Sequence, residues 1–193
     1  MGQKTSLHQR GLTLIECLVT VAILGIMLGM ALPAFGLWMQ QARGTAYVNE
    51  FLASVLLTRS EAIKQRHRVT MCTSADGAFC DTSSAWSHGW IVFHDANANG
   101  LRDANETLVR SQPALTRGWV ATGNSTVQHR ISYVATGHSR QIPQSNGGGG
   151  GFQAGTITFC PPPGHRADAT RVVINSMGRV RTDQAPSANC TVG

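Results

Sequence analysis

The feature that most constrains this chain is an apolar run near its N-terminus. From Cys17 to Trp38 no side chain carries a charge, whereas residues 1–10, MGQKTSLHQR, are polar and basic. At a rise of about 1.5 Å per residue, a helix over this run reaches roughly 33 Å, enough to cross a hydrocarbon core of about 30 Å. Basic residues before such a helix keep the N-terminus in the cytoplasm and direct the rest outward. The sequence therefore predicts a membrane-spanning helix over 12–38 that carries an extracytoplasmic head.

One acidic residue stands at the start of this apolar run. Glu16 lies at its edge, while the helix-breaking residues Pro33 and Gly36 come late in it. A carboxylate inside a membrane is costly unless it is paired, so a partner for Glu16 is expected. A cleaved secretory signal would instead show a shorter apolar core followed by small residues. We therefore expect an anchor, with Glu16 as its first functional residue.

The stretch GLTLIE at residues 11–16 resembles the prepilin processing motif of type IV pilins and type II secretion pseudopilins. The resemblance implies that a prepilin peptidase removes residues 1–11 by cutting after Gly11, and that it methylates Leu12, where phenylalanine is usual. It also implies that Glu16 pairs with the N-terminal amine of a neighbouring pilin or pseudopilin during assembly in the inner membrane. Pro33 matches a further family position. The alternative is a plain signal anchor.

Beyond residue 38 the sequence pattern changes twice. Apolar residues at helical spacing predict that the helix continues over 39–66 into the head. Short runs rich in β-branched and aromatic residues then alternate with glycine and polar clusters, which is typical of strands joined by hairpins. These runs lie at 67–72, 89–94, 106–111, 129–136, 155–160, 170–176 and 178–182. We therefore expect an α+β fold, with a long N-terminal helix packed on an antiparallel β-sheet head over 67–193.

The C-terminal runs extend the family resemblance. RISYVATG, GTITFC and RVVINSMGRVR resemble the GspH/FimT group of minor pilins and pseudopilins, whose heads end in hairpins with a glycine at each turn, here Gly137 and Gly178. The resemblance implies a FimT-like subunit of a type IV pilus or, as the alternative, a GspH-like pseudopilin of a type II secretion filament.

The GRVR stretch at 178–181 is the sharpest binding candidate in the head. In a strand, Arg179 and Arg181 share one face about 6.6 Å apart. Two such guanidinium groups can grip successive phosphates of double-stranded DNA in a salt-sensitive, sequence-independent way. The stretch resembles the GRxR signature of DNA-binding FimT proteins, and Arg166 and Arg171 are expected to widen the patch. The alternative is an edge strand protected by charge.

The net positive charge of the chain favours an anionic partner but does not identify one. The chain has 16 Lys+Arg against 10 Asp+Glu, a formal charge of +6, and only Lys4 and Lys64 are lysines. Arginine offers a planar fork that matches phosphate and carboxylate, but a basic surface shows only that anions are attracted.

Residues 95–106, DANANGLRDANE, fit the calcium-loop pattern D-x-[DN]-x-[DN]-G-x5-E. The candidate ligands are Asp95, Asn97, Asn99, Asp103 and Glu106. Strand-like runs rather than helices flank the loop, and asparagine and glycine are also the residues that a tight hairpin requires. A calcium site and a structural turn are therefore both left open.

Cysteine usage indicates an oxidising compartment. One cysteine falls in the apolar run, and four remain for the head: Cys72, Cys80, Cys160 and Cys190. Their layout suits two disulfides in a periplasm, with four free thiols as the alternative.

No catalytic motif stands out in the sequence. The seven histidines form no HxxH or HExxH pairing, and neither GxSxG nor a GxxxxGK[ST] phosphate loop occurs. We therefore expect no enzymatic activity. Aromatic side chains stack on bases in proteins that bind single-stranded nucleic acid. For Trp86, Trp90 and Trp119, however, the expected role is packing within the head.

Overall fold

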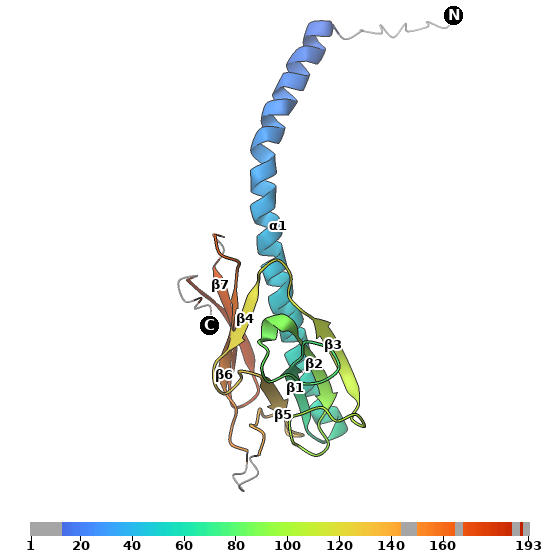
Figure 1. The fold of residues 1–193 in the computed structure, drawn as a ribbon. Coiled ribbons are helices and arrows are strands. Elements are labelled where there is room, and N and C mark those ends of the chain that lie inside the picture. The colour runs from blue at the N-terminus through green and yellow to red at the C-terminus, as the bar shows by residue number, and fades with distance from the viewer. Residues whose placement is uncertain (1–12, 144–149, 165–167, 187–189, 191–193) are drawn as a thin grey trace, which may run out of the picture. The chain divides into compact units, whose positions relative to one another are not determined.

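The computed structural model describes residues 13–143, 150–164, 168–186 and 190. The chain divides into two compact units, Met1–Ala42 and Arg43–Gly193. Helix α1, Leu14–Gln65, begins in the first unit and ends in the second (Figure 1). Within the described part of the chain, no helix combines the length and the apolar character needed to cross a membrane.

Local interactions set the bounds of α1. The backbone N–H and the hydroxyl of Thr13 each donate to Glu16 Oε2 at 3.2 Å, and the Glu16 N–H donates to Thr13 Oγ1 at 3.3 Å. This reciprocal pattern is a capping box, which satisfies N–H groups at the start of a helix. At the other end, Arg66 has a φ of 57°, the left-handed conformation that commonly ends a helix.

The strands that the structure describes in the head form two antiparallel sheets of four strands each (Figure 1). The first has the order β3-β2-β1-β5, and the second has the order β4-β6-β7-β8. The first sheet contains β1 (Val69–Thr73), β2 (Gly89–His94), β3 (Leu108–Pro113) and β5 (Arg130–Tyr133). The second contains β4 (Val120–Gly123), β6 (Gly155–Cys160), β7 (Ala169–Ile174) and β8 (Val180–Ala185). A short 3-10 helix, Trp86–His88, precedes β2.

The expected α+β architecture is confirmed, with two differences. The head holds two sheets rather than the single sheet that the sequence analysis described. Strand β4 was also not predicted, because its four residues, VATG, form no run of β-branched or aromatic side chains. The other strands lie at or within a few residues of the predicted runs.

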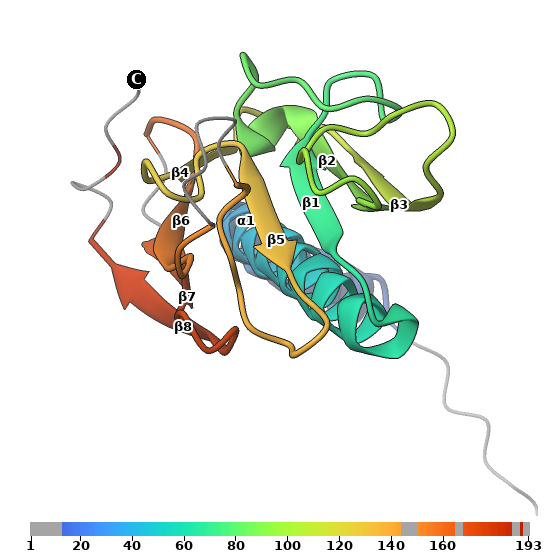
Figure 2. The same cartoon turned by 90° about the horizontal axis from the view of Figure 1, so that it is seen from below.

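Within the head, α1 lies between the two sheets, as the view along the helix shows (Figure 2). Its buried residues recur every three or four positions: Val48, Phe51, Val55, Thr58 and Ala62. This spacing places them on one stripe of the helix, which packs on the inner faces of both sheets.

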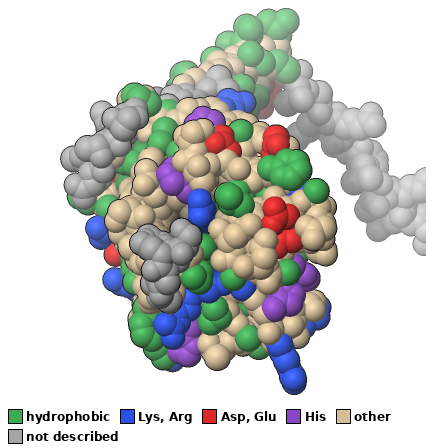
Figure 3. Space-filling model, turned by 60° about the horizontal axis from the view of Figure 1, so that its bottom comes forward, with side chains coloured by type: hydrophobic (Ala, Val, Ile, Leu, Met, Phe, Trp, Pro, Cys, Tyr) green, Lys and Arg blue, Asp and Glu red, His purple; other side chains and the backbone are tan. Residues whose placement is uncertain are grey.

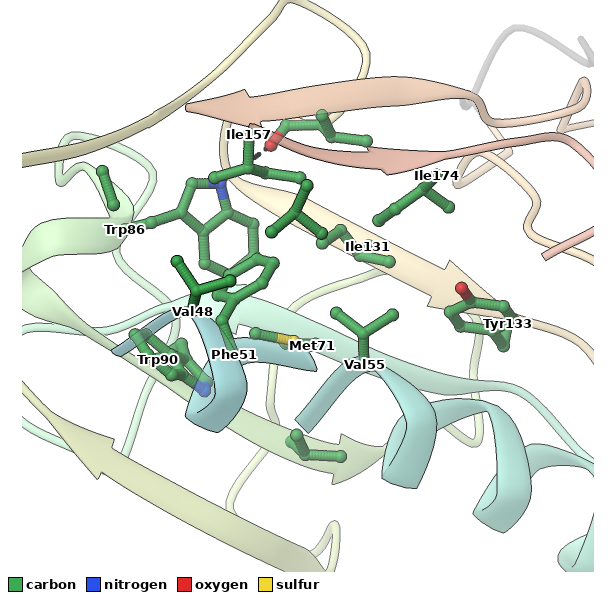
Figure 4. Close-up of a cluster of buried hydrophobic side chains, with 14 of the residues drawn as sticks. Val48, Phe51, Val55, Met71, Trp86, Trp90, Ile131, Tyr133, Ile157 and Ile174 are labelled. Carbon is green, nitrogen blue, oxygen red and sulfur yellow. Dashed lines mark hydrogen bonds between the residues drawn. The ribbon is translucent and has the colours of Figure 1, made fainter. Parts of the chain in front are cut away.

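The centre of the hydrophobic core is aromatic (Figure 4). The Phe51 ring meets Trp86, Trp90 and Phe159 edge-on, with ring centroids 5.2, 5.2 and 5.3 Å away. Such pairs contribute about 0.5–1.5 kcal/mol each beyond the burial of their area. The indole N–H of Trp90 donates to Ser54 Oγ at 2.9 Å. These tryptophans therefore have the core role that the sequence analysis expected.

Two disulfides close the head, which confirms the expectation from the cysteine layout. Cys72 bonds to Cys80, eight residues along the chain, and Cys160 bonds to Cys190, thirty residues along. The first joins β1 to the segment before β2. The second fixes the C-terminal segment beside the end of β6, in a cluster with Ala169 and Ala185.

Candidate functional sites

The first candidate site is the start of the chain. Gly11 and Leu12, the expected cleavage and methylation positions, lie outside the described residues. Glu16 lies in the first turn of α1, where Thr13 donates to its carboxylate, and Pro33 lies within the same helix. The expected pairing of Glu16 with a neighbouring subunit stays a prediction, and the structure adds a local role for its carboxylate as a helix cap.

The second candidate site is the turn between β7 and β8, which presents the GRVR stretch. The Gly178 N–H donates to the carbonyl of Asn175 at 2.9 Å, and the Arg179 N–H donates to Asn175 Oδ1 at 2.9 Å. Gly178 has a φ of 75°, and a Cβ atom there would lie 2.3 Å from the Gly137 carbonyl oxygen. Only glycine therefore fits this turn, and Asn175 fixes the backbone that carries Arg179.

The arginines predicted around this turn have different surroundings. Arg179 is exposed, and the Arg181 side chain is 72% exposed, with one guanidinium nitrogen 3.9 Å from Asp183. Arg171 pairs with Asp183 across the strands and donates to both carboxylate oxygens, at 2.8 and 3.2 Å. Asp183 therefore offsets much of the charge of Arg171, while Arg179 and Arg181 stay available to an anion. Arg166 lies outside the described residues.

Strand β8, which carries Arg181, is an outer strand of its sheet. This is the position that the alternative interpretation of the GRVR stretch requires, because charged side chains on an outer strand oppose pairing with another chain. DNA contact and edge protection use the same exposed arginines, so both interpretations stay predictions.

No sequence motif singled out the residues that surround the turn. Arg59, in α1, donates to the Gly178 carbonyl oxygen at 3.1 Å, and the buried hydroxyl of Tyr133 donates to the same oxygen at 3.3 Å. Burial raises the pKa of Tyr133 to about 12, so this hydroxyl stays a donor across the physiological range. No local sequence signal joins these residues to Gly178, because they come from distant parts of the chain.

The third candidate site, residues 95–106, connects β2 to β3. Asp95 is buried, and its Oδ2 accepts hydrogen bonds from Thr70 Oγ1 at 2.7 Å and from the Gly100 N–H at 3.1 Å. The two oxygens of Glu106 accept from backbone N–H groups of the loop at 2.8 and 3.1 Å. Burial raises the pKa of Asp95, and the nearby charge of Glu106 adds to this shift.

The remaining polar residues of this loop also bond to one another. Asn97 and Asn99 each accept a hydrogen bond from the N–H two residues on, at 3.1 and 2.7 Å, and both donate to Asp103 Oδ2, at 2.7 and 3.2 Å. Among the residues that the structure describes, no group of three or more His, Cys, Asp or Glu side chains is placed to hold a metal ion. Calcium binding stays a prediction, while a structural turn accounts for every one of these hydrogen bonds.

The arrangement of the head defines a class of protein. A long N-terminal helix, capped by the Thr13–Glu16 box, continues into a head of antiparallel sheets that is closed by disulfides. This is the architecture of minor pilins and pseudopilins.

Comparison with protein families agrees with this class. The family described as "Type II transport protein GspH" matches residues 47–178, and the one described as "Prokaryotic N-terminal methylation motif" matches residues 6–32. The chain therefore belongs to the GspH family.

The chain also resembles individual proteins, at lower coverage or low sequence identity. The chain is 34% identical to the pilin-like protein PilA1 of Thermus thermophilus over 101 residues, which are 51% of this chain and 56% of that protein. It thus spans little more than half the length of this curated relative. The type IV minor pilin FimU of Pseudomonas aeruginosa is similar in structure with a TM-score of 0.50 and 18% identity, over 77% of this chain and 92% of FimU. For the minor pseudopilin EpsH from the Type 2 Secretion System of Vibrio cholerae the TM-score is 0.48, with 12% identity over 74% of this chain and 97% of EpsH. The likeness to FimU shows a shared fold.

Proposed function

We propose that residues 12–193 form a minor pilin or pseudopilin subunit of a type IV pilus-like filament. A prepilin peptidase cuts after Gly11 and methylates Leu12, and the helix over 12–38 anchors the subunit in the inner membrane with its head outside. The match of the methylation-motif family to residues 6–32 supports this processing. Mass spectrometry of the membrane-extracted protein tests it, because Gly11→Ala should retain the leader whereas the unaltered chain should lose it.

The role of Glu16 in assembly can be separated from its role as a helix cap. Glu16→Gln keeps an acceptor for Thr13 but removes the charge, whereas Thr13→Ala removes the cap and keeps the charge. If Glu16 pairs with the amine of a neighbouring subunit, Glu16→Gln should be processed normally but be absent from sheared filaments, and Thr13→Ala should be incorporated. The opposite result would make Glu16 a helix cap only.

The head of this subunit is proposed to bind double-stranded DNA through Arg179 and Arg181, as in FimT-like proteins. One observation carries this step: both guanidinium groups are exposed beside a turn whose backbone Asn175 and Gly178 hold in one conformation. A turn of fixed backbone presents both guanidinium groups to the same anion, and binding to successive phosphates weakens as salt rises.

Fluorescence anisotropy with the full-length protein in detergent tests DNA binding. The Arg179→Ala/Arg181→Ala variant should lose most affinity for a labelled duplex and should lower the salt slope by about two phosphate contacts. A matched control, Lys64→Ala/Arg117→Ala, removes the same charge from exposed residues elsewhere on the head and should change binding far less. Equal loss in both variants would indicate general charge attraction, and no loss in the first would exclude the GRVR stretch.

The second candidate function is a pseudopilin of a type II secretion system. The description of the matching family, a type II transport protein, favours it. A strain that lacks this chain distinguishes the two functions, because a secretion subunit should be required for export of folded enzymes into the medium and a pilus subunit for uptake of DNA.

A further inference from the structure

A segment that neighbours the GRVR turn carries an exposed aromatic side chain. Phe152 is 54% exposed, and the guanidinium carbon of Arg140 lies 4.1 Å from the centre of its ring. The two residues form an isolated antiparallel bridge, and Arg140 Nη1 also donates to the Gly150 carbonyl at 3.4 Å. The Arg140–Phe152 pair is therefore a preformed stack of a cation on an aromatic ring, which leaves more than half of the phenylalanine open to solvent.

One hydroxyl group joins this pair to the turn that carries Arg179. Ser139 is buried, and its Oγ contacts the carbonyl oxygens of Gln153 at 2.6 Å and Asn175 at 2.8 Å. Gln153 directly follows Phe152, and Asn175 is the residue that fixes the backbone of Arg179. The exposed ring and the exposed arginine are thus held on neighbouring segments of the same end of the head.

The surroundings of the pair are basic. Arg68 Nη1 donates to the Arg140 carbonyl at 3.3 Å, and Arg59 donates to the Gly178 carbonyl. Burial lowers the pKa of Arg68, the nearby Arg140 acts in the same direction, and Asp95 opposes them. Figure 3 shows Lys and Arg side chains mainly on the lower half of its view with hydrophobic side chains between them, while acidic side chains lie mainly higher. An anion that approaches this end therefore meets several positive charges.

We propose that the Arg140–Phe152 pair is a stacking site for an unpaired DNA base, beside Arg179 as a phosphate contact. This inference rests on the proposed DNA binding and adds the form of DNA that is bound. Bases inside a duplex are stacked on one another and cannot lie on a protein ring, whereas a single strand or a frayed end offers free bases. A phenylalanine ring that carries a guanidinium group matches the flat surface of a base, and the stack needs no particular sequence.

The chain offers a matched control for the ring. Phe79 is 48% exposed and lies 5.6 Å from the guanidinium carbon of Arg102, so it forms a second pair of the same kind. Its backbone N–H donates to Asp76, and Arg102 is already bonded to the carbonyls of Ala78 and Glu106. This second pair lies among the acidic residues Asp76, Asp103 and Glu106 and should not attract DNA.

Anisotropy titrations of the full-length protein with a labelled thymidine oligonucleotide and with a blunt duplex whose ends are clamped by G·C pairs test the proposal. Phe152→Leu, which keeps an apolar side chain but removes the ring, should weaken binding of the single strand roughly fivefold to a hundredfold. It should change duplex binding by no more than about twofold, because the duplex relies on phosphate contacts. Phe152→Tyr should keep the single-strand affinity, and Phe79→Leu should leave both affinities unchanged.

The outcomes separate this inference from the proposed function. If Phe152→Leu changes neither affinity, or changes both equally, the stacking site is overturned; loss of duplex binding in Arg179→Ala/Arg181→Ala then still supports the proposed function. If the unaltered protein binds neither form of DNA, both proposals fail. Because Phe152 is largely exposed, thermal unfolding should show the same midpoint for the leucine variant and the unaltered protein, so that lost binding is not lost folding.

Discussion

The guanidinium group of Arg59 donates a hydrogen bond of 3.1 Å to the carbonyl oxygen of Gly178, which lies 119 residues away in the sequence. The hydroxyl of Tyr133 donates to the same oxygen. The long helix is thereby tied to the turn that presents Arg179 and Arg181. Because the turn depends on this carbonyl, changes in α1 should alter a surface that lies far from it in sequence.

A double-mutant cycle measures how the two hydrogen bonds to the Gly178 carbonyl contribute to stability. Arg59→Met and Tyr133→Phe each leave one donor on the Gly178 carbonyl, so each should cost only the net contribution of one hydrogen bond, about 0.5–1.5 kcal/mol of unfolding free energy. The double variant leaves the carbonyl without either donor, and its cost should exceed the sum of the two single costs by about 1 kcal/mol. Urea unfolding provides these free energies. Strict additivity would show that the two donors act independently and that the carbonyl finds another partner.

Gly44 is required by the packing of Trp119 on α1. A Cβ atom on Gly44 would lie 2.3 Å from the end of the Trp119 ring. Alanine favours a helix over glycine by about 1 kcal/mol, but the clash should outweigh this gain and make Gly44→Ala destabilising by about 1–3 kcal/mol. In a Trp119→Leu background the same change should become neutral or stabilising. An equal cost in both backgrounds, measured by urea unfolding, would exclude the clash as the cause.

The turn at Asp81 should loosen in acid. The Ser83 hydroxyl, together with the Ser84 hydroxyl and the Ser83 N–H, holds the pKa of Asp81 at about 2, below its ordinary 3.8. The folded state thus favours the carboxylate, so its contribution is complete above pH 3.8 and is lost as the pH falls toward 2. The Ser83 amide signal in NMR should shift with a midpoint near this pKa. Ser83→Ala should move the midpoint upward, and an unchanged midpoint would show that Ser83 does not hold the carboxylate.

The fold could be predicted where the signal is local. The charge-free run and the spacing of Val48, Phe51 and Val55 gave the bounds of α1 to within about two residues, which is the usual uncertainty of helix ends. β-branched runs likewise located β6 and β7. Strand pairing could not be predicted in this way. Strand β1 pairs with both β2 and β5, and because β5 lies far along the chain, neither strand's own sequence indicates that the two are partners.

The candidate site likewise has one part that a local sequence signal predicted and another part that depends on contacts between distant residues. Gly178, Arg179 and Arg181 form one continuous motif, so the sequence was enough to single them out. Arg140 and Phe152 are joined by backbone pairing across a glycine-rich segment, and only the folded chain brings them beside Asn175. Arg171 was expected to widen the basic patch, but the register of β7 with β8 places it opposite Asp183. Such cross-strand neutralisation depends on register, which a single sequence does not reveal.

The 95–106 loop makes a prediction that separates a structural turn from a calcium site. Asp95 is buried, its pKa is raised by burial, and its Oδ2 is bonded to Thr70 and Gly100. If these bonds are its role, Asp95→Ala should lower the unfolding midpoint by the same amount with and without calcium. Calcium should be added at about 5 mM, because this concentration lies above the dissociation constants of weak extracellular calcium sites.

Calcium that bound only the folded loop would raise the midpoint, since ligand binding to the native state adds to its stability. We expect no such rise for the unaltered protein, because the loop's own N–H groups already occupy the oxygens of Glu106, Asn97 and Asn99. Differential scanning calorimetry measures the midpoint, with magnesium at the same concentration as the control for ionic strength. A rise that is specific to calcium and is lost in Asp95→Ala would overturn the structural turn and establish a calcium site in its place.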